Sequence, residues 1–398
     1  MERIKGHVEV GQLPPLGKVP EQMWATIIRP DRLGEPKDAM KNELVDIPEI
    51  KPDEVLVAVM AGGVNYNNVW ASLGKPVSVF GMHGAPYHVA GSDASGVVYA
   101  VGSEVRNCKV GDHVVIHCNA ERGPQNVAAK IWGYETPNGG FAQFTNVKGF
   151  QVMPKAKHHT WEEAASYALV LSTAWRMLIS RAKLRPGETV LIWGGAGGLG
   201  VYACQICRLA GAKGVAVVSD DKKGQLAMDL GAVGYINRKE FPDMAWKANE
   251  TPDQAKKRFD AMKAFGKKFM SVTGEKKGPD VVFEHSGAET FPASVFLCNR
   301  YGRVVICGAT TGFHLTFDVR HLWMHQKDIL GSHFASPEEC LEANNLMVQD
   351  KLKPVIDQVV TFDKCPQVHQ LMYENKLAGK ATVLIGAKKA GETDVKLS

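Results

Sequence analysis

Short apolar runs broken by Gly and Pro characterise the first part of the chain. Residues 23–29, 54–60 and 111–117 are examples, with apolar or alternating side chains and turn-forming residues at their ends. Runs of this length and composition are typical of β-strands. No helical repeat between them is long enough for a crossover connection, so the pattern predicts a twisted, mostly antiparallel β domain.

The pattern changes at Thr160. Thr160 and Glu163 have the spacing of a capping box, which predicts that a helix begins there. From residue 188 onward, short apolar runs alternate with helical repeats, an order typical of βαβ units in a parallel sheet. Residues 240–278 are polar, rich in Lys and longer than a simple connection needs, so they predict a helical insertion.

A glycine-rich turn joins the first strand of this alternating series to its helix. It matches the pattern G-x-G-x-x-G and directly follows a predicted strand. Backbone N–H groups at a helix start attract phosphate, and glycines let a ligand approach the backbone closely. The turn therefore predicts binding of a dinucleotide. Its residues are Gly195, Ala196, Gly197, Gly198, Leu199 and Gly200.

The end of the next strand bears on the choice of dinucleotide. Ser219 and Lys223 suit the 2′-phosphate of NADPH, with Arg238 as a third contact. Asp220 and Asp221 would instead suit the ribose hydroxyls of NADH. These residues leave both cofactors open, and we favour NADPH.

The two patterns place one domain inside another, and the predicted class is α/β. We expect residues 1–165 to form the first part of a catalytic β domain and residues 166–312 to form the cofactor domain. Residues 313–398 are expected to supply the remainder of the sheet and to return to the catalytic domain. The reason is that the last apolar run, residues 380–384, resumes the strand pattern of the first part.

Composition excludes several classes of protein. The chain has 398 residues, of which 45% are hydrophobic and 22% charged, so it is too long for a single small module and too apolar to be disordered. The net charge of +5 is spread without long like-charged runs, so neither nucleic acid nor a membrane is an expected partner. No signal-peptide pattern or apolar segment of membrane-spanning length occurs, and we expect a cytoplasmic protein.

Cysteine usage points to the same compartment. The eight cysteines are dispersed along the chain, which indicates free thiols rather than a disulfide framework. The close pair Cys204 and Cys207 falls on adjacent turns of a predicted helix. Because no second pair completes a zinc site, helix packing is the favoured explanation and no metal is expected.

Several segments carry a family resemblance. They are residues 63–67 (GVNYN), 91–98 (GSDASGVV), 140–144 (GFAQF) and the glycine-rich turn. Their order is similar to that of the medium-chain dehydrogenase/reductases. Zinc alcohol dehydrogenases of that superfamily have Gly-His-Glu where this chain has Gly91-Ser92-Asp93, and their four-cysteine lobe is absent here. The chain therefore resembles the zinc-free quinone and enoyl reductase branch.

Further segments narrow the resemblance. Residues 131–136 (IWGYET), 283–287 (FEHSG) and 331–334 (GSHF), together with the insertion, resemble the crotonyl-CoA carboxylase/reductases. This resemblance implies a Rossmann cofactor domain inserted in a mostly antiparallel, GroES-like catalytic domain. It also implies NADPH as cofactor, an enoyl-CoA and CO₂ as substrates, and a homotetramer.

The same resemblance implies a set of residues around CO₂. The family forms this pocket from an asparagine, an aromatic residue followed by glutamate, and a histidine; here these are Asn65 or Asn67, Tyr134 and Glu135, and His333. Tyr134 stands where some members have Phe. An amide NH₂ and an imidazole N–H would orient CO₂, and Glu135 would fix His333 directly or through water.

The implied reaction adds a hydride to Cβ of crotonyl-CoA, after which Cα of the enolate captures CO₂ and gives ethylmalonyl-CoA. One alternative is a non-carboxylating enoyl-CoA or quinone reductase, in which the enolate is protonated. Another is a redox-inactive, NADPH-binding structural protein. The intact glycine-rich turn and the polar pocket residues favour the carboxylating enzyme.

Overall fold

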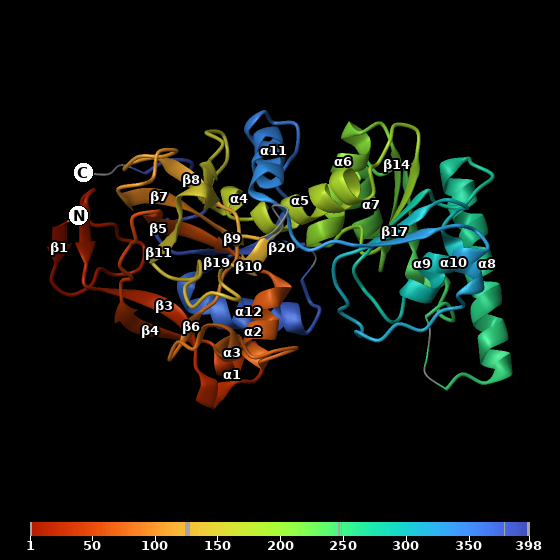
Figure 1. The fold of residues 1–398 in the computed structure, drawn as a ribbon, viewed down its shortest axis with the longest axis horizontal. Helices are drawn as coiled ribbons and strands as arrows, with labels where there is room; N and C mark the ends of the chain where they lie inside the picture. The colour runs from red at the N-terminus through yellow and green to blue at the C-terminus, as the bar shows by residue number, and fades with distance from the viewer. Residues whose placement is uncertain (1, 124–127, 246, 248, 378, 396–398) are drawn as a thin grey trace. The chain divides into compact units, whose positions relative to one another are not determined.

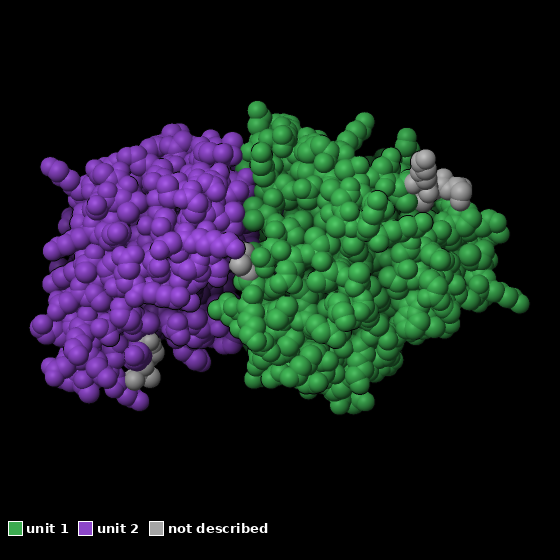
Figure 2. Space-filling model, turned by 180° about the vertical axis from the view of Figure 1, so that it is seen from behind, with its two compact units in different colours: residues 1–172, 335–398 green, residues 173–334 purple. Residues whose placement is uncertain are grey.

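Two compact units make up the structure, a computed structural model that describes residues 2–123, 128–245, 247, 249–377 and 379–395. Unit 1 contains residues 1–172 and 335–398, and unit 2 contains residues 173–334 (Figure 2). The inserted unit therefore ends later than the expected cofactor domain of residues 166–312. The reason is that the last strand of its sheet, β18 (Asp328–Gly331), lies beyond residue 312.

Unit 1 is built on a sheet with the strand order β12-β8-β7-β5-β20-β19, in which β11 also pairs with β5. Most of its pairs are antiparallel, as the strand pattern predicts, whereas β19 and β20 pair in parallel. Every residue of β5 (Glu54–Gly63) is buried, which explains its nearly continuous apolar sequence.

The remaining strands of unit 1 are short. They are β1 (Glu2–Ile4), β2 (Lys18–Pro20), β3 (Gln22–Ile28), β4 (Lys41–Asp46), β6 (His88–Val89), β7 (Ala94–Val101), β8 (His113–Ile116), β9 (Asn119–Arg122), β10 (Ala128–Ile131), β11 (Phe144–Lys148), β12 (Val152–Pro154), β19 (Ile356–Thr361) and β20 (Lys380–Leu384).

The helices outside unit 2 are short as well. They are α1 (Pro36–Ala39), α2 (Tyr66–Leu73), α3 (Val79–His83), α4 (Trp161–Ala164), α5 (Ala168–Trp175), which begins in unit 1, α11 (Pro337–Val348) and α12 (Cys365–Tyr373). The predicted capping box opens α4, where the Thr160 side chain accepts the Glu163 N–H. No helix in the described ranges is long and apolar enough to cross a bilayer.

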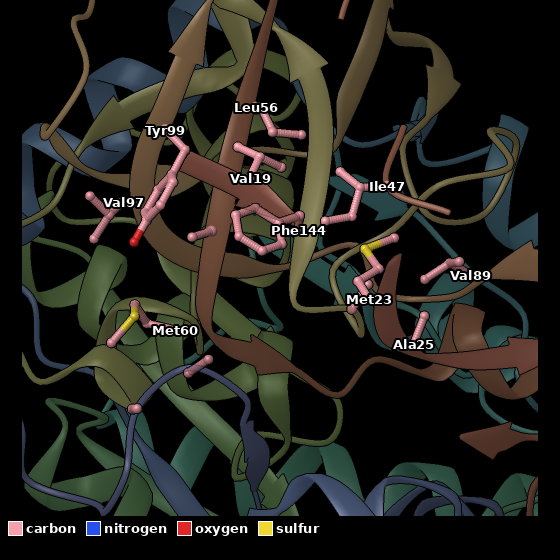
Figure 3. Packing of buried hydrophobic residues seen from close by; sticks show 14 of the residues in the cluster. Val19, Met23, Ala25, Ile47, Leu56, Met60, Val89, Val97, Tyr99 and Phe144 are labelled. Carbon is pink, nitrogen blue, oxygen red and sulfur yellow. The ribbon is translucent and has the colours of Figure 1, made fainter. Parts of the chain in front are cut away.

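The core of unit 1 fills the space beside β5 and β7 (Figure 3). Tyr99 and Phe144 meet edge to face with their ring centroids 5.4 Å apart, and Leu56 and Met60 of β5 belong to the same cluster. The buried Tyr99 hydroxyl donates to the Pro14 carbonyl at 2.8 Å, so its polar atom is satisfied inside the core.

Unit 2 contains a parallel sheet of strand order β15-β14-β13-β16-β17-β18. The order reverses at β13, and ligands of such sheets bind beyond the carboxyl ends of the strands at that point. Its other elements are β13 (Thr189–Ile192), β14 (Lys213–Val218), β15 (Gly234–Asn237), β16 (Val281–Glu284), β17 (Arg303–Ile306), α6 (Gly198–Leu209), α7 (Asp221–Asp229), α8 (Pro252–Thr273), α9 (Phe291–Leu297) and α10 (Arg320–Trp323).

The lysine-rich segment expected to be a helical insertion contains α8, which lies beside α9 in Figure 1. Thr251 caps its start, and Gly274 ends it in the left-handed region at φ +72°. Phe265 on its buried face stacks on Trp193 with ring centroids 5.8 Å apart. Because Trp193 directly follows β13, the insertion supports the strand that leads into the glycine-rich turn.

Candidate active site

The glycine-rich turn connects β13 to α6. Gly194 has a φ of +60°, in the left-handed region, and Gly197 is the N-cap of α6. Ala196 is buried, and Gly198 and Leu199 are the first two residues of the helix. No side chain caps this helix start, so its first N–H groups are available to a phosphate.

Two glycines of the motif are required by close packing of the helix against the sheet. The third leaves the backbone of the turn accessible to a ligand. A Cβ on Gly195 would lie 2.4 Å from Cβ of Ala216 in β14, and a Cβ on Gly200 would lie 2.2 Å from the carbonyl oxygen of Gly194. A Cβ on Gly197 would meet only the Gly194 carbonyl oxygen, at 3.2 Å. Gly195 and Gly200 therefore hold the helix against the strand, and Gly197 leaves room that fits a pyrophosphate.

Ser219, Asp220 and Lys223 meet just beyond the carboxyl end of β14. Lys223 Nζ donates to Ser219 Oγ at 3.2 Å, and Ser219 Oγ donates to an Asp220 carboxylate oxygen at 3.1 Å. The other Asp220 oxygen accepts the Lys223 backbone N–H at 2.9 Å, which lowers the pKa of Asp220. Arg238 is exposed just beyond β15, the neighbouring parallel strand. Lys223 and Arg238 therefore both lie beyond the carboxyl ends of neighbouring strands.

The end of β16 and the residue after it lie on the other side of the turn. Glu284, at the end of β16, is fully buried and accepts the Ser294 hydroxyl at 2.6 Å. The next residue, His285, places Nε2 3.0 Å from the Trp193 carbonyl oxygen, and burial lowers the pKa of its imidazole. A Cβ on Gly194 would come 2.9 Å from the same ring nitrogen. His285 therefore packs against the start of the turn.

In unit 1, Asn65 belongs to a buried polar cluster. Its Nδ2 donates to Asp93 Oδ2 at 2.9 Å, and its Oδ1 accepts from the ammonium group of Lys380. Lys380 Nζ also donates to Asp93 Oδ2 at 2.8 Å. Burial lowers the pKa of Lys380, and the Asp93 carboxylate opposes this effect. Both polar atoms of the Asn65 side chain are therefore engaged.

Asn67, in the first turn of α2, has a different environment. Its Nδ2 donates to Ser92 Oγ at 2.8 Å. Its Oδ1 is buried and has no hydrogen-bond partner among the described residues. A buried acceptor of this kind is satisfied by a group from outside the chain, such as a water molecule or a ligand.

Tyr134 and Glu135 lie on the loop after β10. Glu135 Oε2 accepts the Ile131 N–H at 2.7 Å, which fixes the carboxylate on its own loop. The Tyr134 hydroxyl donates to the Lys75 carbonyl oxygen at 3.3 Å, just beyond the end of α2. Burial raises the pKa of Tyr134, and the Glu135 charge adds to this shift. The loop is thereby tied to the helix that carries Asn67.

A glycine contact brings this loop to Ser92. A Cβ on Gly133, whose φ is +70°, would lie 2.0 Å from the carbonyl oxygen of Gly91. Only glycine fits there, so the loop abuts the residue that precedes Ser92. Unit 1 thus brings Asn67, Tyr134 and Glu135 onto adjoining segments. His333 is exposed and belongs to unit 2, in the segment that follows β18.

Sequence reasoning gave no role to Asp93 or Ser92 beyond their place in a family segment, and none to Lys380 beyond the start of the last strand-like run. One signal was present for Asp93 and Lys380: a lone acidic residue in an apolar strand region and a lone lysine at the start of another. Unpaired charges in such positions are costly to bury, so a mutual partner is expected. Nothing in the sequence singled out the Ser92 hydroxyl.

Comparisons with known proteins identify the family of this chain. The sequence profile of the alcohol dehydrogenase GroES-like domain matches residues 51–157, and that of the zinc-binding dehydrogenases matches residues 198–349. A crotonyl-CoA carboxylase/reductase of Cereibacter sphaeroides is 47% identical over 96% of this chain and 92% of its own length. The chain belongs to the crotonyl-CoA carboxylase/reductase family.

Solved structures of this family have the same fold. The carboxylase/reductase AntE in complex with NADP is 40% identical, with a TM-score of 0.90 over 97% of this chain and 100% of that chain. The 2-octenoyl-CoA carboxylase reductase CinF, in complex with NADP and 2-octenoyl-CoA, is 36% identical, with a TM-score of 0.88 over 94% and 90%. The predicted family and the predicted α/β class are confirmed.

The second profile is named for zinc-binding dehydrogenases. Within those residues, no group of three or more His, Cys, Asp or Glu is placed to hold a metal ion. At the position of the Gly-His-Glu segment of zinc alcohol dehydrogenases, Asp93 pairs with the Lys380 ammonium instead. A cation of the protein itself thus neutralises this carboxylate.

Replacing Gly200 by Ala should weaken dinucleotide binding about tenfold or more, the effect of losing at least one charge-assisted hydrogen bond to phosphate. The added methyl group would displace the Gly194 carbonyl, 2.2 Å away, and move the helix start. Titration with NADPH, followed by fluorescence, measures the dissociation constant. Gly266→Ala in α8, where the new Cβ would meet only a Leu297 methyl at 3.2 Å, is the control. Equal affinities of Gly200→Ala and wild type would contradict the assigned role.

Proposed function

We propose that this protein catalyses the NADPH-dependent reductive carboxylation of an α,β-unsaturated acyl-CoA, with crotonyl-CoA and CO₂ giving ethylmalonyl-CoA. The observation that carries the proposal is the buried, unpaired Oδ1 of Asn67 on a segment adjoining Glu135 and Tyr134. Family membership supports the reductase fold and NADPH, and the polar side chains of Asn67, Tyr134 and Glu135 support the carboxylating step.

The turn residues of unit 2 would hold the cofactor. N–H groups at the start of α6 bind its pyrophosphate, and Ser219, Lys223 and Arg238 bind its 2′-phosphate. When bound, NADPH supplies a hydride for Cβ of the enoyl thioester. Asp220 does not compete strongly for the ribose hydroxyls, because both its oxygens are engaged by its own helix start and Ser219.

The polar residues would decide the fate of the resulting enolate. Its Cα forms a bond to the carbon of CO₂, and one C–O π pair moves onto oxygen to give a carboxylate. The amide of Asn67, rather than the fully engaged amide of Asn65, orients CO₂. His333 would donate to the developing carboxylate, Glu135 would add a second polar group, and the Tyr134 ring would exclude water.

We also propose that the protein acts as a homotetramer in the cytoplasm. Unit 2 presents an edge strand, β18, and exposed apolar side chains at Phe313, Val319, Trp323 and Met324, which a second copy would cover. All eight cysteines are free in the structure, which supports a reducing compartment.

The function is tested by incubating the protein with crotonyl-CoA, NADPH, bicarbonate and carbonic anhydrase. We expect NADPH oxidation at 340 nm and ethylmalonyl-CoA as the main product by mass spectrometry, because exclusion of water would let the enolate react with CO₂ before it takes a proton. Butyryl-CoA alone at saturating CO₂ would favour the non-carboxylating reductase. No oxidation of NADPH would favour the redox-inactive alternative.

Cofactor preference should depend on Ser219 and Lys223. Each charge-assisted hydrogen bond to the 2′-phosphate contributes about 1.5 to 3 kcal/mol, so Lys223→Ala should lower kcat/KM for NADPH about tenfold or more. The kcat/KM for NADH, which lacks this phosphate, serves as the internal control. If wild type uses both cofactors equally well, the 2′-phosphate site is wrongly assigned.

Asn67→Leu and His333→Ala should change the product more than the rate of NADPH oxidation. In both variants the enolate still forms. Its Cα then takes a proton more often than it captures CO₂. Loss of one hydrogen bond costs about 1 kcal/mol, so the ratio of butyryl-CoA to ethylmalonyl-CoA should rise about fivefold or more. Product ratios by mass spectrometry decide this. An equal fall in both products would remove these residues from the CO₂ pocket.

A further inference from the structure

The orientation of the Asn67 amide is fixed by one side chain in unit 1. Asn67 Nδ2 donates to Ser92 Oγ at 2.8 Å, so Oδ1 points away from Ser92. Oδ1 is buried and has no partner among the described residues. The amide therefore offers a ligand one acceptor and one remaining N–H.

Ser92 is itself held from both sides along the chain. Gly91 has a φ of +116°, and its carbonyl oxygen accepts the Gly140 N–H at 2.9 Å. On the other side, Asp93 Oδ1 accepts the Leu169 N–H at 2.6 Å, while Oδ2 takes the Lys380 ammonium at 2.8 Å. Ser92 is fully buried between these anchors. The Ser92 hydroxyl therefore has a fixed position, and its hydrogen bond orients the Asn67 amide.

Two side-chain links join the same pair of segments. Asn65 bonds to Asp93 at 2.9 Å, and Asn67 bonds to Ser92 at 2.8 Å. The first link includes the ammonium of Lys380 and leaves no free amide atom. The second has no charged member and leaves Oδ1 of Asn67 free. The contact between Asn65 and Asp93 is therefore suited to holding the two segments together. The contact between Asn67 and Ser92 is suited to orienting an amide toward a ligand.

We propose that Ser92 is a positioning residue for CO₂ capture, acting through Asn67; this inference rests on the proposed function. Carbon dioxide has an electron-poor carbon and weakly basic oxygens. An amide whose carbonyl oxygen and one N–H are both unused complements these two features. Without the Ser92 hydroxyl, the amide rotates and offers CO₂ a mixture of orientations.

The test compares Ser92→Ala with Ser95→Ala. Ser95 is equally buried, and its hydroxyl donates to the Trp161 carbonyl at 2.6 Å, so both variants lose one buried hydroxyl bond. We expect Ser92→Ala to raise the ratio of butyryl-CoA to ethylmalonyl-CoA and the KM for CO₂ about fivefold, the effect of one lost neutral hydrogen bond. Ser95→Ala should keep the wild-type ratio at a comparable melting temperature.

Two further variants separate positioning from a general loss of structure. Ser92→Thr retains Oγ and should restore the ratio toward wild type. Because Ser92 acts through Asn67, adding Ser92→Ala to Asn67→Leu should cause no further shift in the ratio. An additive shift in the double variant, or an unchanged ratio in Ser92→Ala, would overturn the inference.

Failure of the proposed function has a different signature. A wild-type protein that makes no ethylmalonyl-CoA at saturating CO₂ disproves the carboxylase activity itself. If the wild type carboxylates and Ser92→Ala gives the same product ratio, only the role of Ser92 is disproved. The KM for NADPH, measured in every variant, identifies any effect that originates in the dinucleotide site.

Discussion

The buried ion pair between Lys380 and Asp93 is the interaction on which unit 1 depends. Both side chains are almost completely buried, and such charges are tolerated only when paired and fully hydrogen-bonded. Asn65 meets both partners and completes the set. Because Lys380 opens β20 and Asp93 precedes β7, the pair joins the two ends of the unit 1 sequence beside β5.

This constraint gives the two asparagines of the segment different environments. Both polar atoms of the Asn65 side chain bond to members of the ion pair. Asn67 lies two residues later, on α2, and its amide donates to the neutral hydroxyl of Ser92. The contact of Gly133 with Gly91 then brings the Tyr134–Glu135 loop to the same place. The charged contact of Asn65 with Asp93 and Lys380 and the neutral contact of Asn67 with Ser92 therefore join the same two segments.

Steric constraints play the corresponding role in unit 2. Gly195 and Gly200 are fixed by contacts that no Cβ would allow, whereas a Cβ on Gly197 would meet only the Gly194 carbonyl oxygen, at 3.2 Å. The inserted helix α8 reaches this turn through Phe265 and Trp193. The insertion therefore contributes to the strand that leads into the cofactor turn.

The sequence by itself determined the class of both domains, because period-two apolar runs and βαβ alternation follow from local burial alone. It also located the glycine-rich turn, whose residues are adjacent in the chain and carry their spacing with them. Family motifs supplied Asn65 and Asn67 together, with nothing to separate them.

Only the tertiary structure could show that these two residues have different environments. Their difference lies in Lys380 and Ser92, which are distant in sequence and have no periodic signature. The end of the inserted unit was likewise set by β18, whose place in the sheet depends on its pairing with β17. Pairing partners and buried polar contacts are long-range properties, and a local pattern of side chains does not encode them.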